Sequence, residues 1–416
     1  MRVLLLAPHP FFQQRGTPIA ERLLLEALAA HGHEAEVLTF HEGEDPGLPG
    51  CRIHRIPRLP GIHGIRPGFS AKKLVCDALM LAACLRLIRR RRYDLVHAVE
   101  ESAFMALLAR RLFGVPYVYD MDSLLAQQMI DKFPPLARVR GGLEWFERLA
   151  VRGSSGVLAV CRSIEEKARE YDPQCLVARL EDVTLLPEVA SRPEERESLA
   201  ALAGFTGEAR GPVVLYVGNL ETYQGIDLLL AGFARAAAQV PGARLVVIGG
   251  APEHIRHYQE VAARAGIGES VRFAGPRPVE KLGDYLGQAT VLVSPRTQGT
   301  NTPMKVYSYL DSGRPLLATR LPTHTQVLDD EVACLVEPEP EDFARGLVLL
   351  LTSEPLRERL AGNARALSQR EFTPAAFAGK LLRFYEAVAQ KIGNPPAHAE
   401  PPHSHQPAQP QVHRRG

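Results

Sequence analysis

Short apolar segments alternate with longer segments of helical periodicity through almost the whole chain. This alternation is typical of parallel β-sheets, because each parallel strand needs a crossover, usually a helix, that packs on a face of the sheet. A first series predicts strands at Arg2–Ala7, Glu34–Phe40, Asp94–Val99, Pro116–Asp122 and Gly156–Cys161. A second series predicts strands at Pro212–Val217, Arg244–Gly249, Val271–Ala274, Val291–Ser294, Pro315–Thr319 and Cys334–Val336. The sequence therefore predicts two Rossmann-like, doubly wound α/β domains in tandem.

The boundaries follow from changes in composition along the 416 residues. We expect a first domain over residues 1–187, a charged linker without strands over 188–211, and a second domain over 212–373. A helix is expected at 374–392. A tail rich in Pro and His, 393–416, buries too little apolar surface to order itself. Ligands of such sheets bind beyond the carboxyl ends of the strands, so the functional residues should follow strands and face a cleft between the domains.

Composition excludes several classes of protein. The net charge is +2, from 49 basic and 47 acidic residues, which gives no overall field for nucleic acid. The six cysteines contain no Cys-x-x-Cys pair, which argues against a zinc site or a disulfide framework and favours the cytoplasm. No secretory signal is visible, and Leu74–Ile88, the longest apolar stretch, is interrupted by Asp77 and Arg86.

The loop after the first strand carries a candidate phosphate site. Arg15 and Gly16 precede a predicted helix, and the free amides of a helix start beside a glycine bind anions. An ordinary strand-to-helix turn is the alternative. The loop lacks Gly-x-Gly-x-x-Gly, which disfavours a nicotinamide enzyme.

Titratable groups follow the next two predicted strands. His97, Glu100 and Glu101 come after one, and Asp120 and Asp122 after the other. Converging carboxylates and a histidine suit general acid/base chemistry, so we predict Asp122, Glu101 and His97 as catalytic or acceptor-binding residues. Helix capping by these residues is the alternative reading, and nothing in the spacing favours a metal site.

A basic, amphipathic stretch spans Arg66–Arg92. It holds eight Lys or Arg against one acid, Asp77. Its apolar stripe of Leu74, Val75, Ala78, Leu81, Ala82, Leu85 and Ile88 is expected to pack on the sheet. Docking on an anionic membrane is the alternative, and it would make the protein peripheral at the inner face of the membrane.

The second half carries two polar segments after strands, 217–229 and 294–319. Their hydroxyls, amides and cations could hold a diphosphate. We predict donor or phosphate binding by Asn219, Gln224, Arg296, Gly299, Thr300, Asn301, Thr302, Lys305 and Ser308.

With these segments in view, the sequence resembles the family 4 (group 1) nucleotide-sugar glycosyltransferases of the GT-B fold over roughly residues 1–390. The resemblance rests on five landmarks in the family's order: Gly32-His33-Glu34, Tyr93-Asp94-Leu95-Val96-His97, Val217-Gly218-Asn219, Phe273-Ala274-Gly275 and Ser312-Gly313-Arg314-Pro315-Leu316-Leu317-Ala318-Thr319. It implies that the second domain binds the donor and the first the acceptor. It also implies transfer of a sugar with retention of configuration, hexosyltransferase activity without a metal cofactor, a glycan or lipid-linked acceptor, and a role in cell-envelope polysaccharide biosynthesis.

The chain departs from the family at four charged positions. Asn219 stands where the family usually has Arg, and Gln224 where it has Lys. The usual pair of acids falls on Thr300 and Ser308, and Gln298-Gly299 is the alternative for the first acid-Gly step if the loop length differs. The family histidine after the fifth strand falls on Asp122. We expect Lys305 and Arg296 to supply the missing positive charge, and Tyr307, Ser308 or Asp311 to meet the ribose. The alternative is a non-catalytic relative that binds nucleotide or glycan.

Overall fold

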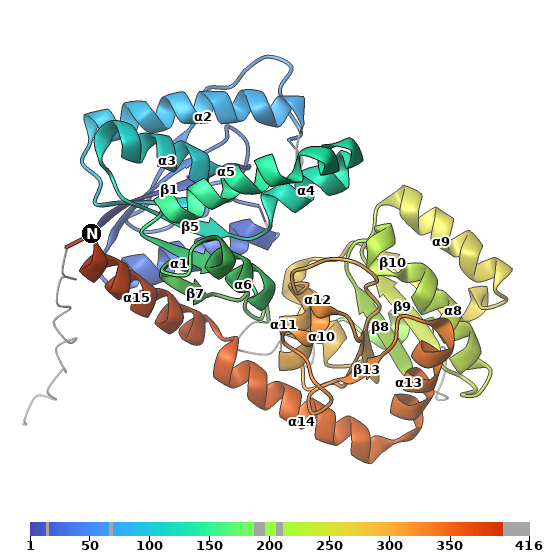
Figure 1. Cartoon of the computed structure of the whole chain (residues 1–416). Helices are drawn as coiled ribbons and strands as arrows, with labels where there is room; N and C mark the ends of the chain where they lie inside the picture. The colour runs from blue at the N-terminus through green and yellow to red at the C-terminus, as the bar shows by residue number, and fades with distance from the viewer. Residues whose placement is uncertain (14–15, 66–69, 187–195, 205–210, 394–416) are drawn as a thin grey trace, which may run out of the picture.

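The chain forms two α/β domains, each built on a parallel sheet with helices on both faces (Figure 1). The computed structural model describes residues 1–13, 16–65, 70–186, 196–204 and 211–393. The predicted fold class is confirmed. Within the described ranges, no helix is long and apolar enough to cross a membrane.

The first domain contains a seven-stranded sheet of order β3-β2-β1-β4-β5-β6-β7. Its strands are β1 Arg2–Ala7, β2 Glu34–Thr39, β3 Arg52–Arg55, β4 Leu95–Val99, β5 Tyr117–Met121, β6 Gly156–Ala159 and β7 Val177–Arg179. The five predicted strands are all present. Two edge strands were not predicted, because β3 consists of Arg-Ile-His-Arg and β7 has only three residues, so neither forms an apolar run.

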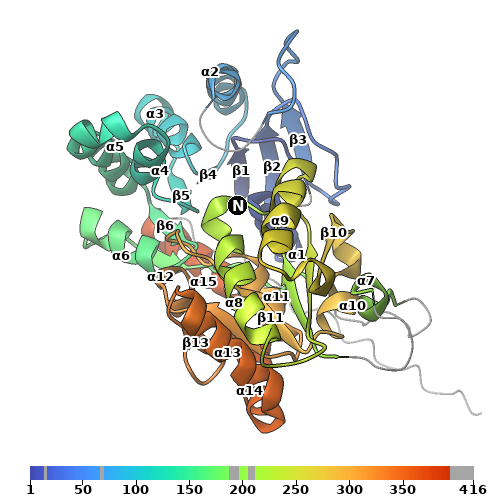
Figure 2. The same cartoon turned by 90° about the vertical axis from the view of Figure 1, so that its right-hand side faces the viewer.

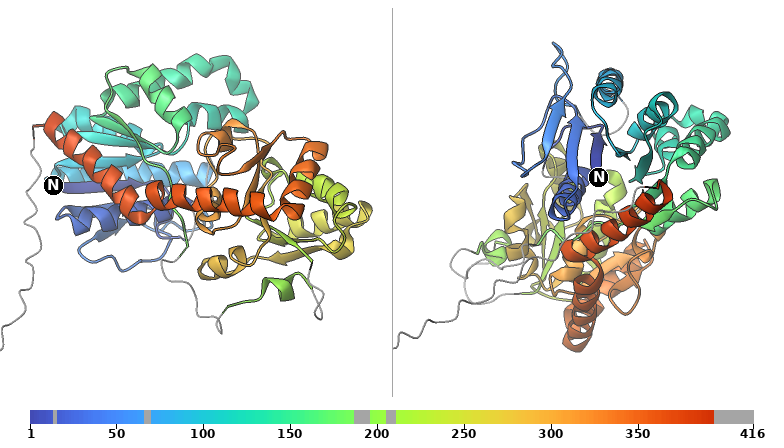
Figure 3. Two further views of the ribbon diagram at one scale, coloured as in Figure 1. Left: turned by 90° about the horizontal axis from the view of Figure 1, so that it is seen from below. Right: turned by 90° about the vertical axis from the view of Figure 1, so that its left-hand side faces the viewer.

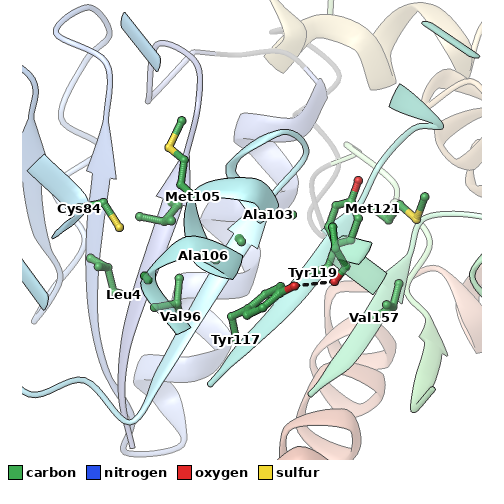
Figure 4. Close-up of a cluster of buried hydrophobic side chains, with 14 of the residues drawn as sticks. Leu4, Cys84, Val96, Ala103, Met105, Ala106, Tyr117, Tyr119, Met121 and Val157 are labelled. Carbon is green, nitrogen blue, oxygen red and sulfur yellow. Dashed lines mark hydrogen bonds between the residues drawn. The ribbon is translucent and has the colours of Figure 1, made fainter. Parts of the chain in front are cut away.

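Helices cover this sheet unequally (Figure 2). One face packs against α1 Gly16–Ala30 and the C-terminal helix α15 Pro374–Lys391. The other packs against α2 Ala71–Arg90, α3 Ser102–Phe113, α5 Arg140–Gly153 and α6 Arg162–Tyr171. Figure 4 shows this second core, in which Val96, Tyr117 and Tyr119 of the sheet meet Ala103 and Ala106 of α3. The sequence did not predict α5, nor α4 Leu125–Lys132 before it.

Helix α2 packs mainly through a face that adjoins the predicted stripe and overlaps it. Its buried residues are Lys73, Cys76, Met80, Cys84 and Ile88. In the predicted stripe, Leu74 is 61% exposed and Val75 42% exposed. The prediction therefore holds for only part of the stripe. Leu81, Leu85 and Ile88 contact the core that Cys76, Met80 and Cys84 fill, whereas Leu74, Val75, Ala78 and Ala82 stay exposed.

The second domain contains a six-stranded sheet of order β10-β9-β8-β11-β12-β13. Its strands are β8 Val213–Val217, β9 Arg244–Ile248, β10 Val271–Gly275, β11 Val291–Ser294, β12 Leu316–Thr319 and β13 Cys334–Val336. Its helices are α8 Ile226–Ala237, α9 Pro252–Arg264, α10 Leu282–Leu286, α11 Lys305–Asp311, α12 Pro322–Thr325, α13 Pro340–Thr352 and α14 Glu354–Glu371. The predicted strands of the second series are all present.

The last two helices run from the second domain back to the first (Figure 3). Helix α14 lies against the second domain, and α15 places Phe377, Leu381, Phe384 and Val388 in the core beside β1, β4 and α1. The C-terminal helix therefore belongs with the first domain. Of the linker expected at 188–211, the described part carries α7 Leu199–Leu202, which packs on the second domain. The tail expected at 393–416 lies outside the described residues except for residue 393.

Candidate active site

A cavity of about 360 Å³ opens at the carboxyl ends of β8, β9 and β11 in the second domain. Its size is within the range of small-molecule sites. Among the residues that line it are Gly218, Asn219, Gln224, Arg277, Arg296, Lys305 and Ser308. The cavity thus brings together five of the nine residues of this domain that the sequence predicted for donor binding. Their role as ligands stays a prediction.

Lys305 and Gln224 meet inside this cavity. The Lys305 Nζ donates to Gln224 Oε1 at 3.0 Å and lies 3.9 Å from the centre of the Tyr216 ring. Burial, and then the nearby Arg296 guanidinium, lower the pKa of Lys305 well below its usual range. Gln224 is itself buried. The ammonium of Lys305 therefore occupies the neighbourhood in which the resemblance places the cation that Gln224 replaces.

Gly218 explains how a ligand could approach this ammonium closely. Its φ is 151°, and a Cβ there would lie 3.2 Å from Lys305 Nζ and 3.0 Å from the Tyr216 hydroxyl. A side chain at position 218 would crowd both groups. The glycine leaves the backbone of this turn open beside the cation.

Arg296 is fixed by its own loop. Its Nε donates to the Gln298 carbonyl at 2.7 Å and its Nη1 to the Asn301 carbonyl at 3.1 Å, and the guanidinium lies 5.1 Å from the centre of the Tyr223 ring. A Cβ at Gly299 would overlap this guanidinium, and the φ of 121° at Gly299 also favours glycine. Burial lowers the pKa of Arg296 from its usual value, and the group remains a cation at neutral pH.

A buried histidine that the sequence did not single out holds this loop in place. His324 of α12 has its Nε2 at 2.8 Å from Ser294 Oγ and its Nδ1 at 2.9 Å from the Thr319 carbonyl. The Thr319 hydroxyl donates to the Arg296 carbonyl at 2.5 Å. Burial lowers the pKa of His324 to about 4. A neutral imidazole therefore ties β11 and β12 to the loop that carries Arg296.

Thr300 and Asn301 face the first domain and do not line the cavity. The Thr300 carbonyl accepts from Ser163 Oγ at 3.4 Å, and Asn301 Nδ2 donates to the Asp122 carbonyl at 3.3 Å. Thr302 is buried beneath them. These residues form part of the contact between the domains.

Ser308 is the one of the three expected ribose partners that lines the cavity. Its Oγ accepts from the Leu185 amide at 2.9 Å, which connects it to the crossover between the domains. The other two lie elsewhere. Tyr307 is buried against the Phe372 ring, and Asp311 accepts from Thr184 Oγ1 at 3.0 Å.

Four acids gather at the carboxyl ends of the first sheet: Glu100 after β4, Asp120 and Asp122 at the end of β5, and Asp182 after β7. Burial and the proximity of Asp120 raise the pKa of Asp122 well above its usual range, while a hydrogen bond to Thr17 at the start of α1 acts in the opposite direction. Burial also raises the pKa of Glu100 and of Asp182 to about 7. Clustered carboxyl groups with raised pKa values are typical of functional sites.

Glu100 also has an unusual backbone conformation. It accepts from Ser123 Oγ at 2.8 Å, and its φ of 51° is the only positive value among the described non-glycine residues. Strained backbone of this kind concentrates at functional sites. The residue predicted from the sequence is Glu101 and not Glu100, because spacing alone does not show where the chain turns.

The structure places His97 and Glu101 differently from each other: His97 reaches the acid cluster through Asp120, whereas Glu101 turns to α2. His97 is fully buried, with Nδ1 at 2.8 Å from the Tyr385 hydroxyl and Nε2 at 3.0 Å from Asp120 Oδ2. Its position inside β4 directs the ring toward α15. Glu101 forms an ion pair with Lys73 of α2 and lines a different pocket.

The predicted phosphate loop of the first domain is described only in part. Gly16 begins α1 with a φ of 40°, and Arg15 lies outside the described residues. Among the residues that the structure describes, no group of three His, Cys, Asp or Glu side chains is arranged to hold a metal ion.

Two doubly wound domains in tandem, with a cation-lined cavity at the strand ends of the second, have the GT-B architecture. Residues 18–187 match the family model described as "Glycosyl transferase 4-like domain", and residues 211–353 match "Glycosyl transferases group 1". The chain belongs to the group 1 glycosyltransferases.

Known proteins agree with this assignment. The chain is 27% identical to a D-inositol 3-phosphate glycosyltransferase of Xylanimonas cellulosilytica, over 88% of this chain and 91% of the relative. The fold matches sucrose-phosphate synthase from Thermosynechococcus elongatus with a TM-score of 0.73 and 21% identity, over 94% of this chain and 99% of that one. It also matches HepE of Anabaena in complex with UDP-glucose, with a TM-score of 0.70 and 17% identity over 92% and 99% of the two chains.

Proposed function

We propose that the protein transfers a hexose from a nucleotide-diphosphate donor to a glycan or lipid-linked acceptor, with retention of configuration and without a metal cofactor. The observation that carries the proposal is the meeting of Lys305 and Arg296 in one cavity at the strand ends of the second domain. Burial lowers the pKa of both groups, so an anionic ligand would stabilise their charged forms. The diphosphate of a nucleotide donor is such an anion.

The cations would act on the leaving group. As the bond between the sugar and the diphosphate breaks, negative charge grows on the phosphate oxygens, and fixed cations in a partly buried site stabilise that charge. They would thereby supply the charge stabilisation for which other transferases use a metal. The HepE structure was determined with UDP-glucose, which supports a nucleotide-sugar donor for this chain.

The acids of the first domain would handle the acceptor. Asp122 joins the second-domain loop through its backbone carbonyl, which accepts from Asn301, so it lies where the two domains meet. We assign Asp122 to orienting the acceptor hydroxyl or the donor sugar, with Glu100 beside it. In a retaining reaction the acceptor attacks from the face that the diphosphate leaves, and a donor phosphate oxygen accepts its proton.

The decisive experiment is donor turnover. The purified chain is incubated with UDP-, GDP- and ADP-sugars in the presence of EDTA, after thermal-shift ranking of the same compounds, because a ligand that favours the folded state raises the melting temperature. We expect slow hydrolysis of at least one donor, with EDTA causing less than a twofold change. Release of the sugar as its original anomer, followed by NMR, supports retention.

Binding without any turnover would support the alternative function, a glycosyltransferase-like protein that binds nucleotide or glycan. The four replaced charged positions, Asn219, Gln224, Thr300 and Ser308, are the specific observation in its favour. The panel separates the two, because the alternative predicts a thermal shift with no loss of donor.

The basic surface of the first domain supports a location at an anionic membrane, where we place a role in cell-envelope polysaccharide synthesis. Lys72, Arg86, Arg89 and Arg90 of α2 are exposed, and part of the predicted stretch, residues 66–69, lies outside the described residues. Co-sedimentation with phosphatidylglycerol vesicles should occur and should weaken with salt, whereas binding equal to that of phosphatidylcholine vesicles would contradict it.

A further inference from the structure

The first domain holds a second pocket that the proposed donor chemistry does not use. It lies between α2, α3, α4 and α5 and has a volume of about 430 Å³. Ten of its thirteen lining residues are apolar, among them Leu74, Leu81, Phe104, Met129, Leu143 and Phe146. In Figure 1 these helices lie together over one face of the first sheet.

The lining at the mouth is open to solvent. Leu74 is 61% exposed and Phe146 is 56% exposed, and Trp145, which packs edge-on against Phe146 with ring centres 4.9 Å apart, is 52% exposed. A contiguous exposed apolar surface of this kind marks a binding site for another apolar group. Helix α2 contributes Leu74, Ala78 and Leu81 to this pocket. Leu74 and Ala78 are exposed, and Leu81 is half-buried against the core.

Two of the three acids in the lining, Glu147 and Glu101, have close partners from the chain itself. Glu147 accepts from the Leu125 amide at 2.7 Å and from the Tyr171 hydroxyl at 2.8 Å. Glu101 pairs with Lys73, whereas Asp77 Oδ1 is buried without a hydrogen bond, 3.9 Å from the same ammonium. The pocket therefore offers apolar contact and little polar recognition, which fits a hydrocarbon chain better than a sugar.

The inner end of this pocket adjoins the acid cluster. Glu101 lines the pocket, and its neighbour Glu100 accepts from Ser123 and is close enough to both Lys73 and Asp120 for their charges to act on it. A chain lying in the pocket would thus present its polar end beside Glu100 and Asp122. On the outside, the exposed cations of α2 favour an anionic head group or bilayer surface.

We infer that this pocket binds the aliphatic chain of a lipid-linked acceptor, with the acceptor's polar end directed to the acid cluster. The inference rests on the proposed transferase function and narrows its acceptor to the lipid-linked class. Only the hydrocarbon part is assigned to the pocket.

The test uses the chain's only tryptophan, Trp145, as a reporter at the mouth. Dodecyl phosphate, below its micelle concentration, should shift the Trp145 emission to shorter wavelength with saturation, and inorganic phosphate should not. Octyl phosphate, which is four CH₂ groups shorter, should bind about 200-fold more weakly, since each buried CH₂ contributes roughly 0.8 kcal/mol. The absence of a saturable shift, or equal binding of the octyl and dodecyl compounds, would overturn the inference.

Helix α2 offers a matched pair of variants. Ala78 and Ala82 are both exposed alanines one turn apart, and only Ala78 lines the pocket. Ala78→Phe should weaken dodecyl phosphate binding at least tenfold, and Ala82→Phe should leave it within twofold of wild type. Equal weakening in both variants, or in neither, would contradict the site. If phosphatidylglycerol vesicles shift the emission equally in both, that shift reports surface adsorption and the dodecyl phosphate result decides.

Activity separates this inference from the proposed function. With a donor that the wild type hydrolyses, Ala78→Phe should keep normal donor hydrolysis but lose at least tenfold in transfer of labelled sugar to the solvent-extractable lipids of a membrane fraction. Unchanged lipid transfer would overturn the acceptor assignment. Dodecyl phosphate binding with no donor turnover at all would refute the transferase proposal and leave the aliphatic-chain site supported.

Discussion

The Lys305 ammonium and the Gln224 side-chain oxygen are 3.0 Å apart, although 81 residues separate them in the chain. A cation carried by α11 thus reaches a position that the resemblance assigns to a lysine at 224. The positive charge of the site therefore comes from position 305 instead of position 224, and substitutions at the two positions can test its role separately.

Removing the cation tests the donor site directly. We predict that Lys305→Ala lowers kcat at least ~100-fold, since a fixed cation stabilises charge that develops on the leaving diphosphate. Donor hydrolysis by the purified variant measures the effect. Arg345→Ala removes an exposed cation from the same domain, 74% exposed at its side chain, and should change kcat less than twofold. Near-normal turnover of Lys305→Ala would remove the anchor of the proposed mechanism.

Exchanging the two residues should restore part of the loss. Lys305→Gln combined with Gln224→Lys returns an ammonium to the same space from the other side of the 3.0 Å contact. We expect the double variant to be at least tenfold more active than Lys305→Gln alone, and a double-mutant cycle on kcat/KM gives the coupling. Independent, additive effects of the two substitutions would show that the contact has no part in donor binding.

Binding of a nucleotide diphosphate should take up a proton. In the empty site, burial holds the pKa of Lys305 well below its usual range, and an anionic ligand raises it. Below the empty-site pKa, the ammonium is charged in both states and affinity is independent of pH. Above it, affinity falls as pH rises, by up to about tenfold per pH unit.

Calorimetric titration with UDP in buffers of different ionisation enthalpy measures this uptake. Lys305→Arg is the control, because a guanidinium stays charged and should bind without proton uptake. The same uptake in this variant would assign the proton to another group.

Apolar runs made the central strands of both sheets predictable, because parallel strands buried on both faces are continuous in Val, Leu and Ile. Edge strand β3 was not predicted, because its sequence is polar. The packing face of α2 was predicted only in part. Periodicity identified an apolar stripe, but the sheet packs mainly against the neighbouring face of Cys76, Met80 and Cys84. Periodicity shows that a helix is amphipathic and does not choose between two adjoining apolar faces.

Site residues in the polar segments that follow strands were predictable from the sequence. Arg296 comes directly after β11, and the polar segment that it opens leads to Lys305. His324 could not be predicted, because its role depends on contacts with Ser294 and Thr319 across two strands, which no spacing reveals. Glu100 and Glu101 are adjacent, and only the backbone turn at Glu100 decides which one joins the acid cluster.

His324 should make stability depend on pH. Its pKa is about 4 in the folded protein against 6.5 when unfolded, so the fold favours the neutral ring. This contribution is complete above pH 6.5 and is lost as pH falls toward 4, by about 3 kcal/mol in total. His324→Gln should therefore lose less stability than wild type over that interval. Urea unfolding followed by circular dichroism at pH 7, 5 and 4 gives the comparison.

The control for that series is His257→Gln, which replaces an exposed histidine of the same domain. It should follow the wild-type profile, because the acids that also titrate in this interval are unchanged in both variants. A His324→Gln profile parallel to wild type would mean that the imidazole is already protonated in the folded state.

Asp122 and His97 distinguish a residue at the cleft from one in the core. Asp122→Asn keeps the size of the side chain and removes its ionisable carboxyl group. We predict at least a ~100-fold loss of transfer with UDP-sugar affinity unchanged within about threefold, because the cations proposed to hold the nucleotide diphosphate lie in the second domain. Tyr385→Phe removes the hydroxyl that bonds His97 at 2.8 Å and leaves a buried ring nitrogen without its partner. That change should cost ~1–3 kcal/mol of stability with kcat unchanged. Initial-rate kinetics and urea unfolding of both variants measure these effects. If kcat were lost in Tyr385→Phe and kept in Asp122→Asn, His97 would have a role in the reaction and Asp122 a structural one.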